Sequence, residues 1–124
     1  MLANCSNHVL TRVIMLVGVL LALIACNQPM PNESALRVVA TEMQFTPSSL
    51  TTEVGALVFI TLVNEGKVAH NLLIDLPSGT RQVAAEDGVD AVLSFPAREA
   101  GNFRFYCSIP GHEAMQGTLT IAAP

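Results

Sequence analysis

Three side chains that bind soft metals lie close together near the carboxyl terminus. The stretch FYCSIPGHEAMQG, residues 105–117, contains the thiol of Cys107, the imidazole of His112 and the thioether of Met115. A lone cysteine or methionine in a β domain is usually a packing residue. All three in one short segment could ligate a single metal ion, provided that the chain turns back on itself here.

The local sequence predicts such a turn. Residues 102–107 alternate between two faces, which puts Cys107 on the same face as the phenylalanines, at the end of a strand. A proline and a glycine follow at 110–111 and favour a tight turn, because proline fixes φ and glycine accepts a positive φ. The turn can bring His112 back toward Cys107, and Met115 follows before the last strand begins.

A fourth ligand must come from elsewhere in the chain. Of the three histidines, His8 lies in an amino-terminal segment that export is expected to remove, which leaves His70 beside His112. His70 begins the apolar stretch HNLLIDL, where an imidazole without a partner would be costly to bury. One thiolate, two imidazoles and one weak thioether form the donor set of a blue copper site. Structural zinc normally takes four Cys or His ligands, and calcium and magnesium prefer oxygen. The donor set therefore predicts one copper ion that cycles between Cu(I) and Cu(II).

Short β segments must position these ligands. From residue 36 onward the chain contains stretches rich in Val, Ile, Thr and Phe, separated by turns that contain Pro, Gly, Asn or Ser. They are LRVVAT, SLTTEV, ALVFITLV, HNLLIDL, AVLSF, NFRFYC and GTLTIAA. No segment has a sustained helical period, although residues 81–90 could hold a turn or a short helix. About seven strands in one small domain predict an all-β fold, an antiparallel Greek-key β-sandwich.

The amino terminus is typical of an export signal that ends in a lipid-attachment site. Arg12 precedes the uncharged run VIMLVGVLLALIA, which matches the charged and apolar regions of a signal peptide. The run is shorter than the roughly 20 apolar residues that a membrane-spanning helix needs. Residues 23–26, LIAC, resemble a bacterial lipobox, in which the chain is cut before the cysteine and the cysteine is lipidated. We therefore predict a signal peptide at residues 1–25 and a lipid anchor at Cys26; the alternative is a short anchor helix with an incidental cysteine.

Cysteine usage singles out Cys107. Cys5 lies in the removed segment and Cys26 would carry lipid, so the mature chain has no partner for a disulfide. In an exported protein a lone thiol is expected to be either buried or held by a ligand. Residues 26–35 are rich in Pro, Asn and Gln and predict a flexible tether, which leaves residues 36–124 as the folded domain.

The charge balance excludes one class of partner. Without Arg12 the chain has five basic residues against ten acidic ones, a formal net charge of −5 with histidine neutral. A surface of this sign argues against nucleic acid as a partner. The acidic residues at 86, 87 and 90 are most simply a solvated loop face.

Two motifs together resemble those of the cupredoxins, the family of azurin, plastocyanin and amicyanin. They are AHN at 69–71, followed by an apolar strand, and YCSIPGHEAM at 106–115, before the final strand. The resemblance covers about residues 36–122. It implies three strong equatorial copper ligands and one axial ligand: His70, Cys107, His112 and Met115. Only two residues separate the second histidine from the methionine, a spacing similar to that of amicyanin-like loops and shorter than in azurin-like ones.

The resemblance also implies roles for residues around the ligands. Asn71 follows the first histidine, and in cupredoxins the residue at this place donates its backbone N–H to the cysteine sulfur. Its side chain would tie the two ligand-bearing segments together. The N–H of Ile109 is a second candidate donor to the thiolate, and such bonds tune a metal by stabilising its reduced state.

Function follows from what this set of residues lacks. It has too few imidazoles for an oxygen-reducing copper cluster and no second cysteine for a dinuclear copper centre. With every good ligand committed, no strong position stays open for a small-molecule substrate. We therefore expect a non-enzymatic carrier of single electrons, lipid-anchored to a bacterial membrane and facing the periplasm or cell exterior. Redox proteins such as cytochromes or a terminal oxidase would be its partners.

Two alternatives stay open. A copper-binding lipoprotein for metal delivery or tolerance would usually have exposed His-rich or Met-rich tracts, which the sequence lacks. A structural or adhesive β-sandwich lipoprotein would use Cys107 only for packing. Spectroscopy of the copper-loaded protein separates the three.

Overall fold

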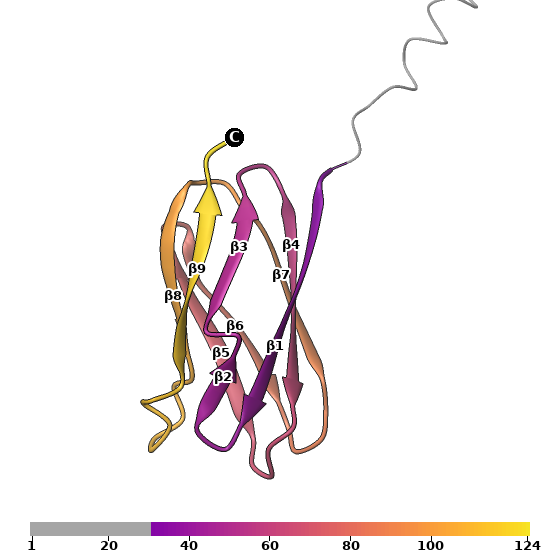
Figure 1. Cartoon of the computed structure of the whole chain (residues 1–124), viewed down its shortest axis with the longest axis vertical. Helices are drawn as coiled ribbons and strands as arrows, with labels where there is room; N and C mark the ends of the chain where they lie inside the picture. The colour runs from indigo at the N-terminus through magenta and orange to yellow at the C-terminus, as the bar shows by residue number, and fades with distance from the viewer. Residues whose placement is uncertain (1–30) are drawn as a thin grey trace, which may run out of the picture. The chain divides into compact units, whose positions relative to one another are not determined.

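The computed structural model describes residues 31–124, which form nine β-strands (Figure 1). In chain order they are β1 (Glu33–Thr41), β2 (Gln44–Thr46), β3 (Ser49–Glu53), β4 (Leu57–Asn64), β5 (His70–Leu76), β6 (Gly79–Ala85), β7 (Ala91–Pro96), β8 (Gly101–Tyr106) and β9 (Gln116–Ala122). Between residues 31 and 124, no helix is long and apolar enough to span a membrane. The predicted signal peptide, the lipobox, Cys26 and the first part of the predicted tether lie outside the described residues.

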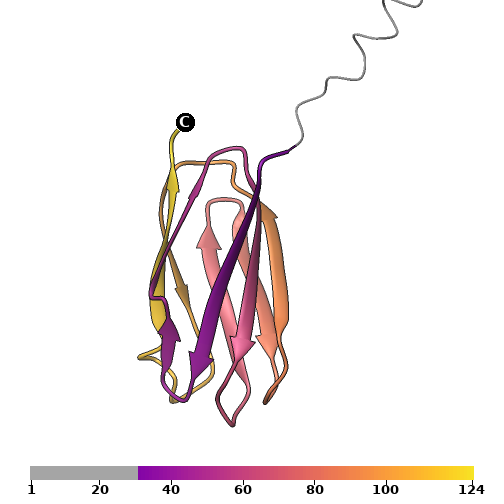
Figure 2. The same cartoon turned by 45° about the vertical axis from the view of Figure 1, so that its right-hand side comes forward.

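The strands form two sheets that face each other. One sheet has the order β2-β1-β4-β7, and the other has the order β3-β9-β8-β5-β6 (Figures 1 and 2). The pairs β1–β4 and β3–β9 are parallel and the other pairs are antiparallel. The predicted all-β sandwich is confirmed. Each sheet is mixed, because it contains one parallel pair among antiparallel ones.

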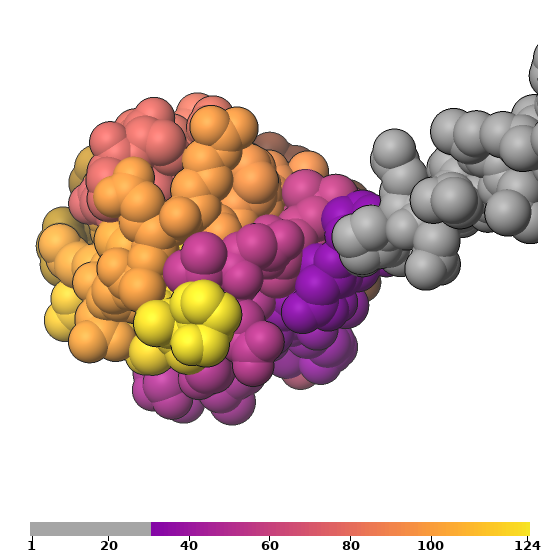
Figure 3. Space-filling view, turned by 90° about the horizontal axis from the view of Figure 1, so that it is seen from above, coloured from indigo at the N-terminus to yellow at the C-terminus, as the bar shows by residue number. Residues whose placement is uncertain are grey.

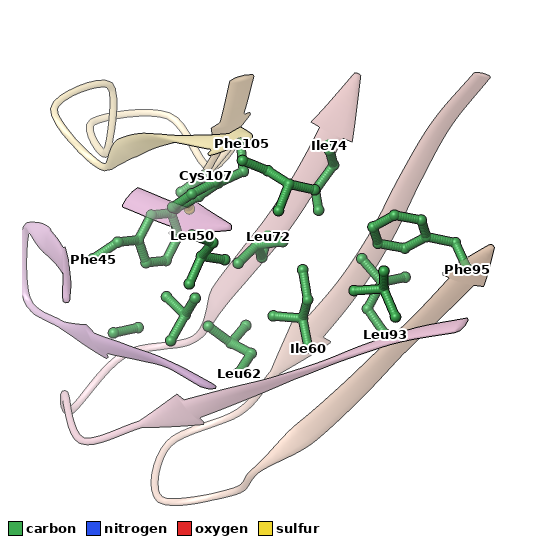
Figure 4. Close-up of a cluster of buried hydrophobic side chains, with 14 of the residues drawn as sticks. Phe45, Leu50, Ile60, Leu62, Leu72, Ile74, Leu93, Phe95, Phe105 and Cys107 are labelled. Atoms are coloured by element: carbon green, nitrogen blue, oxygen red, sulfur yellow. The ribbon is translucent and has the colours of Figure 1, made fainter. Parts of the chain in front are cut away.

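Alternating side chains from both sheets fill the space between them. β4 buries Val58, Ile60 and Leu62 completely, while the residues between them are partly exposed. From the other sheet, Leu72 and Ile74 of β5 point into the same cluster (Figure 4). Cys107 and Met115 belong to this cluster too, so two of the predicted metal-binding side chains are anchored in the core.

The structure differs from the sequence prediction in three elements. β1 begins at Glu33, three residues before the predicted start of the domain, because residues 33–35 pair with residues 57–59 of β4. Of the turn or short helix allowed for residues 81–90, the turn is present at residues 86–89 but there is no helix there: residues 79–85 form β6, which pairs with β5. β6 was missed because it is an edge strand, largely exposed and therefore without an apolar alternation. β2 was missed because it has only three residues.

One end of the sandwich collects the loops that carry the predicted ligands. The turn at 42–43 and the loops 65–69, 86–90 and 107–115 all lie at the bottom of Figure 1. The strand registers place them together, since Leu62 pairs with Ala91 and His70 pairs with Ala85 at that end. We call it the ligand end. The first residues of β1 and the carboxyl terminus lie at the opposite end, seen from above in Figure 3.

Candidate metal centre

Three of the four predicted ligands converge at the ligand end. His70 is the first residue of β5, Cys107 directly follows β8, and His112 lies in the loop between β8 and β9. One ligand atom from each of the three side chains lies within 4.8 Å of the other two. Within residues 31–124 they are the one group of three or more His, Cys, Asp or Glu side chains with such an arrangement.

The distance between the ligand atoms of Cys107 and His112 fits two ligands bound to the same metal ion. Cys107 Sγ lies 3.6 Å from His112 Nδ1. A sulfur and a nitrogen bonded to one metal at about 2.3 and 2.0 Å, at trigonal or tetrahedral angles, would lie about 3.5–3.7 Å apart. The His70 and His112 rings are inclined at 42°, with centroids 4.9 Å apart.

His70 has an unmet need for a partner. Its side chain is fully buried, and neither ring nitrogen has a hydrogen-bond partner. Burial lowers the pKa of His70, and the nearby His112 lowers it further, so the imidazole is held neutral. A buried polar group without a hydrogen bond is costly. A neutral imidazole with a free lone pair is, however, the form that binds a metal, and a soft metal ion between His70, Cys107 and His112 would supply a partner for one of the two ring nitrogens.

Consecutive hydrogen-bonded turns shape the loop that carries the other ligands. The N–H of His112 donates to the carbonyl of Ile109 at 3.0 Å, and the N–H of Met115 donates to the carbonyl of His112 at 2.9 Å. The N–H of Cys107 closes the loop by donating to the carbonyl of Met115 at 3.0 Å. Gly111 has a φ of 89°, the positive value that the predicted Pro-Gly turn requires. Met115 is fully buried, and its backbone lies beside Cys107.

Asn71 joins the two ligand-bearing segments. Its side-chain Nδ2 donates to Ser108 Oγ at 2.9 Å, and its Oδ1 accepts from the Ser108 N–H at 2.8 Å. This is the kind of tie that the cupredoxin resemblance implies for this side chain. The donor roles of the Asn71 and Ile109 N–H groups toward the Cys107 sulfur stay predictions.

Glu113 stabilises the tip of the same loop. Its carboxylate accepts a hydrogen bond from the Gly111 N–H at 3.0 Å. This bond is the main reason why the pKa of Glu113 lies below its ordinary value. The carboxylate is exposed and belongs to the turn.

Sequence reasoning missed one residue of this region. Asn64 ends β4 and is buried, although its local sequence, NEGK, predicts only a turn. Its Oδ1 accepts from the N–H of Gly66 at 3.0 Å, a local bond that an asparagine two residues before a glycine often makes. The sequence therefore shows the two-residue spacing between Asn64 and Gly66, but it does not show that the Asn64 side chain is buried.

Comparisons with known proteins agree with this fold and site. The family described as cupredoxin-like domain matches residues 13–121. A plastocyanin from Dryopteris crassirhizoma is 32% identical over 91 residues, which cover 63% of this chain and 87% of the plastocyanin. The trio His70, Cys107 and His112 is positioned as a copper site of this family.

Solved structures show the same fold at lower sequence identity. Auracyanin A, a "blue" copper protein from Chloroflexus aurantiacus, has a TM-score of 0.66 and 20% identity, covering 73% of this chain and 100% of its own. Auracyanin B has a TM-score of 0.65 and 20% identity, covering 77% and 92%. A copper-containing nitrite reductase from Thermus scotoductus has a TM-score of 0.62 and 24% identity, covering 73% of this chain but 28% of the reductase. With the family match extending over most of its length, the chain belongs to the cupredoxin family.

Proposed function

We propose that this protein is a type 1 blue copper protein that carries single electrons between redox partners. The observation that carries the proposal is the convergence of Cys107, His112 and the buried, unpartnered His70 on one point of a cupredoxin sandwich. Bound copper would supply a reversible Cu(I)/Cu(II) couple. The protein would hold the donor atoms in one geometry for both states, which keeps rearrangement on electron transfer small.

In this proposal the four ligands have unequal roles. His70, Cys107 and His112 are the strong ligands, and Met115 is the weak axial one. The hydrogen bonds of the ligand loop and the two bonds between Asn71 and Ser108 support this assignment, since they fix both ligand-bearing segments without the metal. The N–H of Asn71 and that of Ile109 would donate to the thiolate and favour the reduced state.

Electron carriage fits this chain better than catalysis. The nitrite reductase that shares the fold is an enzyme, but this chain spans only 28% of it. The residues described here, 31–124, bring together one cluster of metal-binding side chains, and the proposed ligand set leaves it no strong open position for a substrate. The plastocyanin and the auracyanins, in contrast, are matched over most of their length.

The edge of His112 is the proposed port for electrons. His112 is partly exposed, and small or apolar residues stand beside it in its own loop and just before His70 at the same end. We call them the collar: Val68, Ala69, Ile109, Pro110, Gly111 and Ala114. Val68 is 47% exposed, as expected of a contact surface and not of core packing. A small apolar contact suits a carrier that must bind and leave quickly, and the partners would be redox proteins such as cytochromes or a terminal oxidase.

The proposed location is the outer side of a bacterial membrane. Export by the signal peptide and lipidation at Cys26 would tether the domain without a membrane-spanning segment. The described part of the chain begins at the end opposite the ligand end, so a tether there leaves the collar free to dock.

The optical spectrum of the copper-loaded protein tests this function. The oxidised wild type should show an intense sulfur-to-copper charge-transfer band, and Cys107→Ser should abolish the band while circular dichroism shows that the fold is kept. Met43→Leu is the matched control, because Met43 is an exposed thioether at the ligand end and no proposed ligand. A colourless Cu(II) complex of the wild type would rule out the blue copper assignment.

A further inference from the structure

The Asn64 side chain is a buried hydrogen-bond hub at the ligand end. Only 3% of the residue is exposed. Its two Nδ2 hydrogens are shared among three carbonyls, those of Val68 at 2.8 Å, Glu86 at 2.9 Å and Ala85 at 3.1 Å. Its Oδ1 accepts from the Gly66 N–H at 3.0 Å. One amide thus uses both its donor and its acceptor capacity inside the protein.

These bonds enclose His70 on two sides. Gly66 and Val68 belong to the loop that leads into His70. Ala85 is the residue that pairs with His70 across the β5–β6 ladder, and Glu86 follows it. Asn64 therefore fastens both the segment before His70 and the strand beside it to the end of β4.

Gly66 brings this network into contact with the imidazole itself. A Cβ atom at position 66 would lie 3.1 Å from His70 Nε2 and 3.3 Å from Asn64 Oδ1, both closer than most real contacts. The φ of Gly66 is not positive, so its backbone conformation does not demand glycine. The position needs glycine because the loop lies directly against the ring.

The packing of Gly66 against His70 takes the place of a hydrogen bond that metal-binding histidines usually make. Such a histidine normally donates its second ring N–H to a carboxylate, carbonyl or water, which fixes the ring. Neither nitrogen of His70 has such a partner, and Nε2 faces Gly66. The ring orientation must then be fixed by packing.

We propose that Asn64 and Gly66 form a clamp that holds the His70 imidazole in its ligating orientation before the metal binds. Both are positioning residues, which act on the metal only through His70. The clamp leaves Nδ1 as the nitrogen available to the metal, since Nε2 is covered by Gly66. This inference rests on the proposed role of His70 as a copper ligand.

The sharpest test compares two glycine-to-alanine variants in the full-length protein. Gly66→Ala adds a methyl group against His70 Nε2 without backbone strain. Gly88→Ala, in the loop 86–90 at the same end, has open space around its Cβ but a φ of +67°. We expect Gly66→Ala to shift the charge-transfer band and the copper hyperfine splitting and to weaken copper binding about 10-fold or more. Gly88→Ala should lower the melting temperature and leave the spectrum unchanged.

Nuclear magnetic resonance of the metal-free protein gives a readout that does not depend on copper. With ¹⁵N-labelled histidine, wild-type His70 should show one ring orientation and one neutral tautomer, and Asn64→Ala should broaden or split these signals. Asn102→Ala is the matched control, because Asn102 makes one exposed hydrogen bond to Thr120 away from the site. If Asn64→Ala does not fold, the nuclear magnetic resonance spectra of Gly66→Ala and of the wild type still test the clamp.

The outcomes separate the clamp from the function. A wild type with the charge-transfer band, whose band, copper affinity and His70 signals are all unchanged by Gly66→Ala, would overturn the clamp and leave the blue copper assignment intact. Copper bound to His70 through Nε2, or several His70 ring orientations in the metal-free wild type, would also overturn it. A wild type without the band but with a single His70 orientation that Gly66→Ala disturbs would support the clamp and refute the proposed function.

Discussion

His70 is the proposed ligand whose position costs the metal-free fold most stability. A fully buried imidazole without a hydrogen bond destabilises the metal-free protein. Cys107 and Met115 do not have this conflict, because a thiol and a thioether pack well in an apolar core. His70 is therefore the ligand that gains most from the metal and the one whose cost can be measured without it.

Protonation of His70 should make the metal-free protein less stable at low pH. Burial lowers its folded pKa below the ordinary value of about 6.5, so below that pH the unfolded chain takes up a proton that the folded chain refuses. The free energy of unfolding should fall as the pH drops through about 6.5, by up to about 1.4 kcal/mol per pH unit, and level off below the folded pKa. Urea unfolding of wild type and His70→Leu between about pH 5 and 7.5 measures the difference. A difference between the two proteins that does not change with pH would contradict this account.

At the scale of elements, the site depends on connections between strands that belong to different parts of the chain. β5 supplies His70, while the β8–β9 loop supplies the other ligands, and β5 pairs with β8 through residues 73–74 and 105–106 only. The bonds between Asn71 and Ser108 continue this connection up to the site. They hold together two segments that are 37 residues apart in sequence.

Removing this tie should affect the site more than the fold. Asn71→Ala deletes two exposed hydrogen bonds, each worth about 0.5–1.5 kcal/mol at most, so the loss of stability should be small. The ligand loop should become more mobile, and copper should pass to a chelator severalfold faster. Thr80→Ala is the control, since Thr80 makes a similar exposed bond to Asp75 within the β5–β6 hairpin. Equal rates of copper loss in the two variants would show that the tie does not matter for the site.

At the scale of the whole molecule, the two ends of the sandwich differ. Residues 31–124 expose four large hydrophobic side chains. The ligand end carries the collar and three of these four, Met43, Val68 and Val89, and the fourth, Val92, lies in the strand that starts there. The opposite end carries the start of β1 and the carboxyl terminus. The molecule thus separates the surface proposed for docking from the surface proposed for attachment.

A charge within the collar should slow electron exchange without changing the metal. Ala114 is exposed and is not one of the proposed ligands, so Ala114→Asp should keep the visible spectrum and nearly keep the potential. Burying a carboxylate in an apolar contact is unfavourable, and exchange with the physiological partner should become severalfold slower or more. Ala100→Asp, the same change on an exposed residue between β7 and β8 at the opposite end, is the control. If both variants exchange electrons as fast as wild type, electrons leave by another surface.

Loss of the lipid should release the protein while its chemistry is kept. Cys26→Ser should abolish lipidation and move the protein from the membrane to the soluble fraction, or leave an uncleaved precursor. Cys5→Ser should change neither, because that residue would be removed with the signal. Mass spectrometry of the mature wild type settles the point, and an amino terminus well beyond Cys26 would refute the anchor.

Local chemistry made much of the fold and the candidate site predictable from the sequence. The alternating strands around Phe105, the Pro-Gly turn and the donor types at 107, 112 and 115 are all short-range features, and His70 was the one histidine left to join them. The all-β class followed from the same short-range patterns and is confirmed.

Only the tertiary structure decided the contacts that join distant segments. The parallel pairing of β1 with β4, the edge strand β6 and the bond from Asn64 to Ala85, 21 residues away, leave no periodic signal in the sequence. The sequence around Gly66 is that of an ordinary turn, and only the fold shows that this glycine lies against His70. The physical reason is that donor type and turn propensity belong to each residue and its neighbours, whereas the burial and orientation of a side chain depend on what the rest of the chain packs around it.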